Sequence, residues 1–430
     1  MIRNSFIMTF ILAVMLIGFL CGTLFMNQVT GMGPKDILVW NSYGPSENKL
    51  FTEIAAEWSK TNPGGYKIHV AQIPWMGQES KYRTALIAGA PPDIGRVDTP
   101  FVPELVHNGI LEDITQFTTP EILKEYVPAA ISSCIIKDKD GKERVYGFPD
   151  QTNGACLFYN KQLFREAGLD PENPPKTWDE FLAYCKKLTI PEKDQFGFGM
   201  DNSLWWSFPF FNTYGAEFLN PEGDKCLLNS KEAIAALQFK IDLYRVHNVE
   251  GRAWSSGGRK PEDGFLNKRY AMVLMGPWKV ADFRKAKVDF GVALVPAGPK
   301  GTSTNVGGTN MVIFKQRKRS NEHLKACYDF LRYLTSAEVQ AKWASELRQI
   351  PVNMGAYANV KIDDSEEAKI LSVFMEQMKT AKARPKVLKY AQLELIINPE
   401  MENALNGGKT VEQALNDAVK RIEAEALPKK

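Results

Sequence analysis

Residues 37–98 begin with ILVWN and continue through SENKLFTEIAAEWSK at 46–60, YKIHVAQI at 66–73, QESKYRTALIA at 78–88 and DIGRVD at 93–98. The first, third and fifth segments are short and either apolar or alternating, a pattern that predicts strands. The second and fourth carry apolar residues at helical spacing, which predicts amphipathic helices. Strands that alternate with helices form βαβ units, so this stretch predicts a parallel sheet covered by helices on both faces.

A second α/β sheet is predicted further along the chain. Residues 156–160 and 271–275 are short apolar runs bounded by turn residues, the pattern of strands buried on both faces. Capping boxes predict helices that begin near Thr177, Asn229 and Thr410. Because no linker separates the two sheets, we expect two lobes joined by more than one strand, as in hinged binding proteins.

The amino terminus carries an uncharged, almost wholly apolar run from Ser5 to Met26, which is long enough to span a bilayer at about 20 residues. Residues 1–33 are therefore predicted to be a signal peptide or an N-terminal membrane anchor, with the rest of the chain in the periplasm or on the outer face of the cytoplasmic membrane. No A-x-A-like cleavage site precedes Gly31, so a retained helix stays open, as does a lipid-modified Cys21.

Composition and charge argue against nucleic acid as a partner. The chain of 430 residues is 44% apolar, enough for a buried core, and its 53 basic and 50 acidic side chains leave a formal charge of +3. Because these charges are spread along the sequence, no field strong enough to hold nucleic acid is expected.

The six cysteines lack the spacing of a structural zinc site. Their scatter favours isolated core cysteines, with one disulfide between Cys134 and Cys156 as the alternative in an oxidising compartment. We expect no metal and no cofactor.

Candidate ligand contacts follow the predicted strands, because open α/β sheets bind ligands beyond the carboxyl ends of their strands. Asn41 and Tyr43 follow the first strand, and Asp98 ends the third. Such groups suit a sugar, whose hydroxyls need paired hydrogen bonds and whose C–H faces stack on flat rings. Helix capping is the alternative role for Asp98.

Aromatic residues give a second set of candidates. Trp205 and Trp206 begin the densest aromatic run, and because adjacent tryptophans point in different directions on a helix, we expect one of them to line a cleft and the rest of the run to fill the core. Trp278 follows strand 271–275 and a Gly-Pro turn, and its position makes it the strongest aromatic candidate. The polar stretch 149–154 is predicted to be a turn at a hinge.

Motifs for catalysis are weak. Gly407-Gly408-Lys409-Thr410 resembles the end of a phosphate loop, but Asn403 occupies the position of its first glycine. The histidines show no metal-ligand spacing, and no serine lies in a nucleophile elbow. A pair of acids for glycoside cleavage stays open, because such pairing is spatial.

Six short motifs occur in a recognisable order. They are LVW at 38–40, AGAPPDI at 88–94, YGFP at 146–149, LFYNK at 157–161, TWDEF at 177–181, and AM at 271–272 running to GPW at 276–278. Over residues 37–427 the chain resembles the family 1 extracellular solute-binding proteins of ABC transporters, a group that includes maltose-binding protein and receptors for glycerol phosphate.

The resemblance implies a two-lobed α/β fold of the periplasmic-binding-protein type (type II). Each lobe would be a mainly parallel sheet flanked by helices, and the lobes would close on ligand like a Venus flytrap. We expect lobe 1 at residues 34–152 plus 309–347 and lobe 2 at residues 153–308 plus 348–430.

The resemblance also places Tyr43, Asp98, Asn153, Trp206, Trp278, Gly308, Asn310 and Arg348 near positions that contact ligand. Asn41 and Trp205 complete the predicted site. Asn153 stands where some maltodextrin receptors have an acid, which argues against maltose itself. Arg348 suits a phosphate or an acidic sugar, with a surface or interlobe salt bridge as the alternative.

These expectations describe an extracytoplasmic receptor that binds a sugar or oligosaccharide by hinge closure, without catalysis, and delivers it to the transmembrane subunits of an ABC permease. Two alternatives stay open. One is a membrane-anchored carbohydrate-active enzyme, and the other is a sensory or adhesive sugar-binding module.

Overall fold

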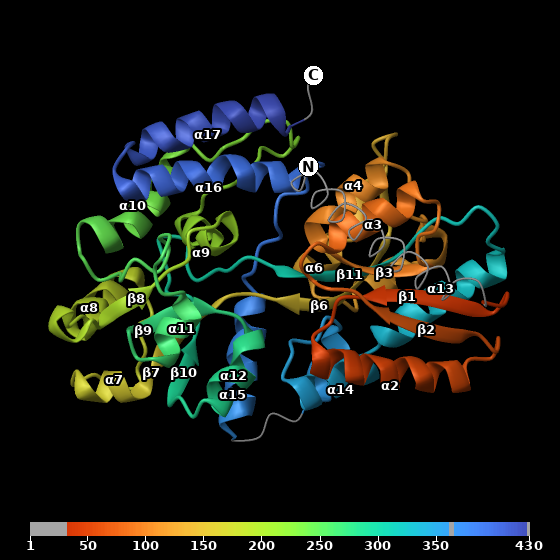
Figure 1. Ribbon diagram of the computed structural model, residues 1–430, viewed down its shortest axis with the longest axis horizontal. Coiled ribbons are helices and arrows are strands. Elements are labelled where there is room, and N and C mark those ends of the chain that lie inside the picture. The colour runs from red at the N-terminus through yellow and green to blue at the C-terminus, as the bar shows by residue number, and fades with distance from the viewer. Residues whose placement is uncertain (1–31, 361–364, 428–430) are drawn as a thin grey trace, which may run out of the picture.

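The computed structural model describes residues 32–360 and 365–427, which form two α/β lobes joined at the centre of the molecule (Figure 1). The predicted two-lobed fold is confirmed. The signal or anchor helix predicted within residues 1–33, including Cys21, lies almost entirely outside the described residues. In the part of the chain that the structure describes, no helix is both long and apolar enough to cross a membrane.

The strands have the following bounds: β1 Asp36–Asn41, β2 Lys67–Gln72, β3 Ile94–Asp98, β4 Ile135–Lys137, β5 Glu143–Val145, β6 Gly147–Asn153, β7 Cys156–Asn160, β8 Phe196–Gly199, β9 Tyr270–Met275, β10 Phe290–Ala293 and β11 Gly307–Ile313. The α-helices are α2 Pro45–Thr61, α3 Gln78–Ile87, α4 Val102–His107, α5 Pro120–Leu123, α6 Pro128–Ser132, α7 Lys161–Glu166, α8 Trp178–Leu188, α9 Leu204–Tyr214, α10 Lys231–Arg245, α11 Pro261–Leu266, α12 Val280–Lys285, α13 Asn321–Leu334, α14 Ala337–Leu347, α15 Glu366–Met378, α16 Tyr390–Asn406 and α17 Val411–Glu425. Short 3₁₀ helices include η1 Thr99–Phe101 and η4 Pro277–Lys279.

Lobe 1 is built on a five-stranded sheet with the order β2-β1-β3-β11-β6. β1 pairs parallel with β2 and β3, as the βαβ pattern predicts, whereas β11 pairs antiparallel with β3 and β6. Side chains of α2, α13 and α14, including Phe51, Phe330 and Trp343, pack together in one apolar core under this sheet. All five elements predicted between residues 37 and 98 are confirmed to within one residue at each end.

Lobe 2 is built on a four-stranded sheet with the order β10-β7-β9-β8. β7 and β9 are buried along their whole length, as predicted. The expectation of a mainly parallel sheet needs correction here, because β7 pairs antiparallel with both β9 and β10. β7 follows β6 after only Gly154 and Ala155, so the crossing strand sets its direction and no βαβ crossover does.

Strands β6 and β11 carry the chain between the lobes. They pair antiparallel from Gly147↔Val312 to Gly307↔Asn153, with an irregularity between Thr309 and Asn310. The turn predicted at 149–154 is therefore wrong, because residues 149–153 continue β6. This stretch is polar and does not look like a strand in the sequence. Its backbone forms hydrogen bonds with β11, which is remote in sequence.

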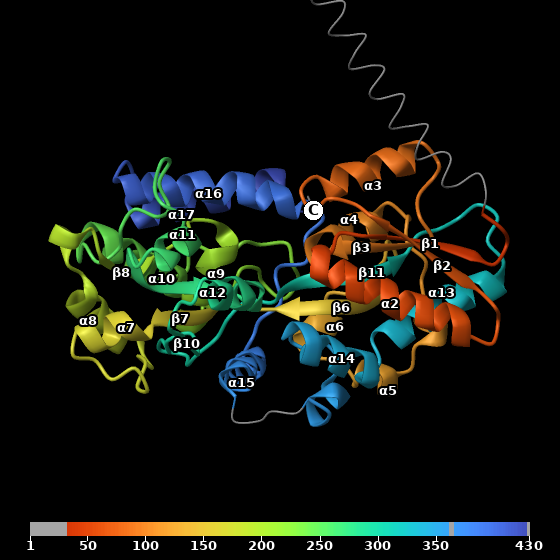
Figure 2. The same cartoon turned by 60° about the horizontal axis from the view of Figure 1, so that its bottom comes forward.

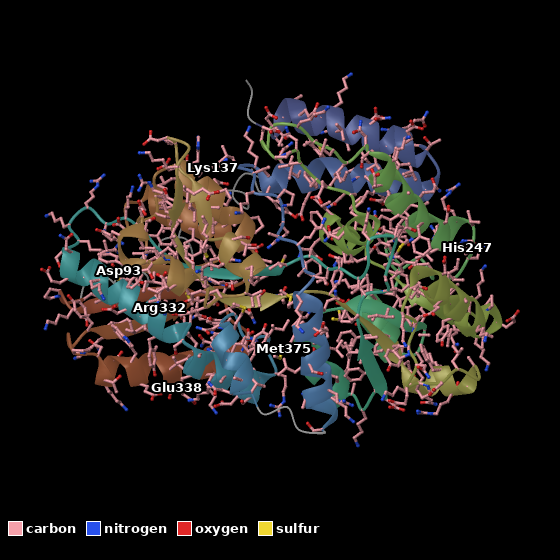
Figure 3. The ribbon with its side chains drawn as sticks, turned by 180° about the vertical axis from the view of Figure 1, so that it is seen from behind. Asp93, Lys137, His247, Arg332, Glu338 and Met375 are labelled. Carbon is pink, nitrogen blue, oxygen red and sulfur yellow. The ribbon has the colours of Figure 1, made fainter. Side chains whose placement is uncertain are left out.

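The remaining elements fill out each lobe. Seen from behind, Asp93, Arg332 and Glu338 lie in lobe 1, His247 lies in lobe 2, and Met375 of α15 lies close to the junction (Figure 3). α15 follows lobe 1 helix α14 in sequence and contacts β7 and β10 of lobe 2, so the chain crosses between the lobes here as well.

The predicted helix starts are mostly confirmed. Thr177 caps α8, and Thr410 forms a complete capping box with Gln413 at α17. The start predicted at Asn229 is displaced by one residue, since the N-cap of α10 is Ser230, whose Oγ accepts a hydrogen bond from the backbone N–H of Ala233.

The cysteines at 134, 156, 185, 226 and 327 are buried free thiols. This agrees with the expectation of isolated core cysteines. The alternative, a bridge between Cys134 and Cys156, is not formed.

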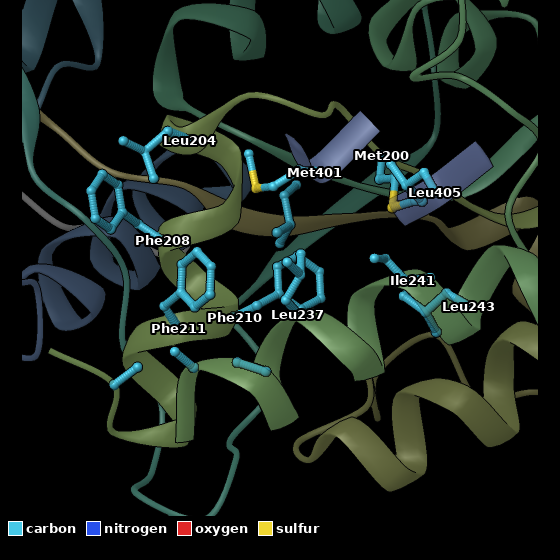
Figure 4. Close-up of a cluster of buried hydrophobic side chains, with 14 of the residues drawn as sticks. Met200, Leu204, Phe208, Phe210, Phe211, Leu237, Ile241, Leu243, Met401 and Leu405 are labelled. Carbon is cyan, nitrogen blue, oxygen red and sulfur yellow. The ribbon is translucent and has the colours of Figure 1, made fainter. Parts of the chain in front are cut away.

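A large apolar core of lobe 2 lies between α9, α10 and α16 (Figure 4). Lys240 of α10 is fully buried beside this core, where its Nζ donates to Ser207 Oγ at 2.7 Å. Burial lowers the pKa of Lys240 to about 8, a shift that the carboxylates of Asp201 and Glu250 oppose only in part.

We expect the substitution Lys240→Met to abolish a rise in stability at alkaline pH. Because the pKa of Lys240 is about 8 in the folded chain and 10.5 as the reference value, the unfolded chain binds more protons between these values, and stability rises with pH across that window. Relative to Lys240→Met, the free energy of unfolding of the native protein should rise by about 3 kcal/mol from pH 8 to 10.5. Urea titrations measure this difference.

Lys231→Met is the control, because Lys231 is exposed at the start of the same helix. Its pH profile should follow that of the native protein. The expectation would be contradicted if the difference in free energy of unfolding between the native protein and Lys240→Met stayed constant with pH.

Candidate functional site

A cavity of about 500 Å³ lies at the junction of the lobes, within the roughly 300–1,000 Å³ range of small-molecule sites. Lobe 1 contributes Ser42, Gly44, Glu47, Trp75, Arg96 and Asp98 to its lining. The crossing strands contribute Gln151, Thr152, Asn153, Gly307, Gly308 and Thr309. The rest of the lining is Trp205, Trp206, Pro277, Trp278, Gln349 and Arg384.

Three tryptophans form the wall on lobe 2. The ring centroids of Trp205 and Trp206, at the start of α9, lie 4.5 Å apart with the planes at 83°. Trp278 of η4 lies 5.9 Å from Trp205 and 6.3 Å from Trp206. A Cβ on Gly276 would lie 1.9 Å from the Trp278 ring, so glycine at the end of β9 lets this indole fold back over the backbone.

Trp75 supplies aromatic surface from the opposite lobe. It lies in the loop between β2 and α3 and lines the same cavity. Trp75 is 47% exposed and Trp278 is 43% exposed. Both lobes therefore offer an indole to a ligand in the cavity.

Arg96 of β3 is buried in the cavity floor, where each of its three side-chain nitrogens donates a hydrogen bond. Nε donates to Asp150 Oδ2 at 2.8 Å, Nη1 donates to Ser42 Oγ at 3.2 Å, and Nη2 donates to Gln151 Oε1. The guanidinium also lies over the Tyr43 ring at 4.0 Å. Burial lowers the pKa of Arg96, but the charge of Asp150 and those of its neighbours outweigh burial and leave the pKa raised.

Glu47 of α2 accepts three hydrogen bonds at the lobe 1 side of the cavity. Its Oε2 accepts from the backbone N–H of Gly44 at 2.7 Å at the start of α2. Its Oε1 accepts from Gln151 Nε2 at 2.9 Å and from Gln349 Nε2. These bonds fix two amide side chains at the cavity surface.

Asp98 and Arg384 connect the lobes. Arg384 Nη2 donates to Asp98 Oδ1 at 2.7 Å and to Thr99 Oγ1 at 2.5 Å. Asp98 ends β3 of lobe 1, whereas Arg384 precedes α16 of lobe 2. Because Arg96 pairs with Asp150 and Arg384 pairs with Asp98, each arginine among the described lining residues already has a carboxylate partner.

Six residues predicted from the sequence line the cavity: Asp98, Asn153, Trp205, Trp206, Trp278 and Gly308. Both adjacent tryptophans reach it, although only one was expected to do so. At Gly308 the φ angle is +136°, and a Cβ would lie 2.1 Å from the Gln151 carbonyl oxygen, so only glycine fits this part of the floor. Direct ligand contact by these six stays a prediction.

The other four predicted residues, Asn41, Tyr43, Asn310 and Arg348, are not among the residues that line this cavity. Asn41 is buried and accepts from the Tyr43 backbone N–H at 3.1 Å. Tyr43 is buried beneath the cavity, where its hydroxyl donates to Asp150 Oδ2 at 2.6 Å. Asn310 follows the irregularity in β11 and exchanges hydrogen bonds with the Ser133 hydroxyl.

Arg348 is exposed at the end of α14, with φ +57° and its guanidinium directed to the Ser345 carbonyl oxygen. The residue after it, Gln349, lines the cavity instead. The left-handed backbone at Arg348 turns the chain, so the residue after the predicted one reaches the lining.

Sequence reasoning also missed Glu47, Trp75, Arg96, Gln151 and Arg384. Trp75 carried a usable signal, because it lies two positions after the predicted strand 66–73. Arg384 carried none, since it belongs to no helix or strand and reaches the cavity only through the packing of the two lobes.

Comparisons with known proteins agree with this geometry. The family model of bacterial extracellular solute-binding proteins matches residues 44–341. The crystal structure of a cyclic alpha-maltosyl-1,6-maltose binding protein from Arthrobacter globiformis is similar with a TM-score of 0.81 and 26% identity, over 91% of this chain and 99% of that one.

Two curated relatives show the range of ligands among similar proteins. A maltotriose-binding protein of Pyrococcus abyssi is 22% identical over 76% of this chain and 68% of its own length. An sn-glycerol-3-phosphate-binding periplasmic protein of Brucella melitensis is 25% identical over 69% of this chain and 70% of its own length. The relatives are named as binding proteins, for neutral and for anionic solutes.

We expect Asp150→Ala to destabilise the chain by about 3–5 kcal/mol, because removing one partner of a buried ion pair leaves the Arg96 guanidinium buried and uncompensated. Urea denaturation measures the loss. Asp289→Ala is the matched control, since Asp289 pairs with Arg165 at the exposed surface, where such pairs contribute little. If both substitutions lower the free energy of unfolding equally, the buried Arg96–Asp150 pair contributes no more to stability than the exposed pair.

Proposed function

Since the chain belongs to the family of bacterial extracellular solute-binding proteins, we propose that it binds a carbohydrate in the cavity between its lobes and delivers it to the permease of an ABC importer. Delivery requires an extracytoplasmic location, which the apolar run at 5–26 would provide as a signal or anchor.

The observation that carries the proposal is the combination of indole surface and paired charge in one cavity. Trp75 lies on lobe 1, and Trp205, Trp206 and Trp278 lie on lobe 2. Their flat rings suit the C–H faces of sugar rings. Amides of Gln151, Asn153 and Gln349 offer both donors and acceptors to hydroxyl groups.

The same pairing of charges favours an uncharged ligand over a phosphate. Arg96 and Arg384 are the arginines of the described lining, and each is already engaged by a carboxylate. An anionic ligand would meet two guanidinium charges that Asp98 and Asp150 already neutralise, so it would gain less from them than from an unpaired arginine. Among ligands named for the relatives, a maltose-type saccharide fits better than glycerol phosphate.

Ligand capture would follow from closure of the lobes. A saccharide that contacts Trp75 on lobe 1 and Trp278 on lobe 2 gains most from a closed arrangement, so it shifts the open-closed equilibrium toward closure. The crossing strands β6 and β11 and the segment after α14 would serve as the hinge.

The hydrogen bonds made by the carboxylates of the cavity lining argue against an enzyme. Glycoside cleavage needs two acids that flank the scissile bond, one of them free to donate a proton. Glu47 is committed to three hydrogen bonds and Asp98 to Arg384. We therefore propose binding without chemistry.

Titration calorimetry of the full-length protein against neutral oligosaccharides, sugar acids and glycerol 3-phosphate tests the proposal. We expect binding of a neutral saccharide that is recovered intact. Tight binding of glycerol 3-phosphate would contradict the charge argument, and cleavage of the sugar would establish the enzyme instead. Stimulation of uptake by the permease in vesicles separates a transport receptor from a sensory module.

Trp278→Ala should weaken saccharide affinity by roughly 10- to 100-fold, because truncating an aromatic anchor at a binding surface costs about 1.4–2.8 kcal/mol. Trp278→Phe keeps a flat ring and should retain most of the affinity, as calorimetry will show. If both variants bind like the native protein, Trp278 is not a ligand contact.

A further inference from the structure

A separate cavity of about 450 Å³ lies in lobe 1, where the start of β1, the turn before β3 and the start of α13 meet. We call it the α13 cavity, and its lining includes Asp36, Asp93, Arg319 and His323. Helix α13 begins on the side of lobe 1 that faces away from lobe 2 (Figures 1 and 2). Among the described residues, the α13 cavity shares no lining with the cavity between the lobes.

Three side chains with metal-binding atoms converge beside the α13 cavity. His323 and Cys327 stand at positions i and i+4 of α13, a spacing that puts both on one face of the helix. Asp93, which directly precedes β3, completes the group, and one ligand atom from each residue lies within 4.8 Å of the other two. Zinc binds carboxylate oxygen, imidazole nitrogen and thiolate sulfur at about 2.0–2.3 Å, so small movements of these side chains would bring all three onto one ion.

The imidazole of His323 is held with one nitrogen available. Its Nδ1 lies 3.2 Å from the Pro34 carbonyl oxygen, which can only accept, so Nδ1 is the donor. In the neutral ring Nε2 then carries a lone pair. This nitrogen is buried, lies 3.4 Å from Asp93 Oδ1 and has no hydrogen-bond partner among the described residues. Donation to a carbonyl group through one nitrogen is the arrangement of a histidine that binds metal through the other.

The Cys327 thiol is fully buried, and burial raises its pKa. The thiol therefore keeps its proton unless a cation at the sulfur stabilises the thiolate. Binding of zinc would release this proton to solvent. An ion can enter from the α13 cavity, because Asp93 and His323 both line it.

The charges beside the three side chains also favour a divalent cation. Arg319 Nη2 lies 2.8 Å from Asp93 Oδ1 and Nη1 lies 3.5 Å from Glu112 Oε1, so with a neutral His323 two carboxylates face one guanidinium. A zinc ion together with the Cys327 thiolate adds one positive charge, which makes the group neutral. Asp93 Oδ1 accepts from Arg319 with one lone pair and keeps a second for the ion. The alternative source of the missing charge is a second proton on His323.

We propose that Asp93, His323 and Cys327 form a zinc site in lobe 1, with water from the α13 cavity as the remaining ligand. The ion would tie α13 to the turn before β3 and, through the hydrogen bond between His323 and Pro34, to the segment before β1. The site is structural and does not depend on what binds between the lobes. The spacings of complete zinc sites missed it, because two ligands lie on one helix and the third comes from a turn remote in sequence.

Zinc binding to the full-length protein, reduced and freed of metal with a chelator, tests the proposal. We expect one equivalent to bind and to raise the melting temperature, because an ion that binds only the folded chain stabilises it. His323→Gln and Cys327→Ser should each weaken zinc affinity by about 100-fold or more, since loss of an outer partner alone costs about 10- to 100-fold. Competition with a chromophoric chelator measures the affinities.

Cobalt(II) in place of zinc identifies the ligands in the native protein. We expect a thiolate-to-cobalt charge-transfer band that Cys327→Ser removes. Because the band is read in the native chain, this measurement decides the question even where a variant folds poorly.

His69→Gln is the matched control, because His69 is an exposed histidine that pairs with Asp36 of the α13 cavity lining. It should change neither the zinc affinity nor the cobalt spectrum.

Three results would overturn the zinc site. One is zinc affinity that is the same in the native protein and in His323→Gln, which would leave a proton as the charge between His323 and Asp93. Another is a cobalt complex of the native protein without the thiolate band. The third is binding that only His69→Gln removes, which would indicate an adventitious ion at the surface.

Discussion

The antiparallel pairing of β6 with β11 is the constraint on which both lobes and the cavity depend. Each strand belongs to the sheet of lobe 1 and leads directly toward lobe 2, so the ladder from Gly147↔Val312 to Gly307↔Asn153 sets where the lobes meet. The same ladder forms the cavity floor, because the pairs Gly308↔Thr152 and Thr309↔Gln151 line it. Gly308 permits this close approach, since any side chain there would meet the facing carbonyl group.

Above this floor the charges neutralise one another before any ligand arrives. Tyr43 and Asp150 hold the Arg96 guanidinium within lobe 1, while Asp98 holds Arg384 across the lobes. A cleft arranged in this way presents indole faces and neutral hydrogen-bonding groups, which are the needs of a saccharide. The interlobe pair lines this cavity and a second one that adjoins it between the lobes, so one interaction joins the lobes and separates the space between them into two parts.

Hydrophobic periodicity predicted helices and strands well where the burial of one face is what stabilises the element. The βαβ segment 37–98 was placed to within one residue, because hydrophobic periodicity decides which face of each element is buried. Asp98 and Trp278 were found because ligands in α/β sheets gather at strand ends. The polar stretch 149–154 was misassigned, since its strand depends on pairing with β11, and the direction of β7 was misjudged for the same reason.

The amino-acid sequence alone therefore determined the two α/β lobes, the family resemblance and the aromatic character of the cavity. Only the tertiary structure decided that Arg96 and Arg384 are neutralised by partners, that Gln349 and not Arg348 reaches the cavity, and that a second cavity adjoins the first. The physical reason is the distance along the chain over which each kind of interaction acts. Periodicity and capping act over a few residues, whereas ion pairs and cavities join residues such as Asp98 and Arg384 that come together only when the lobes pack.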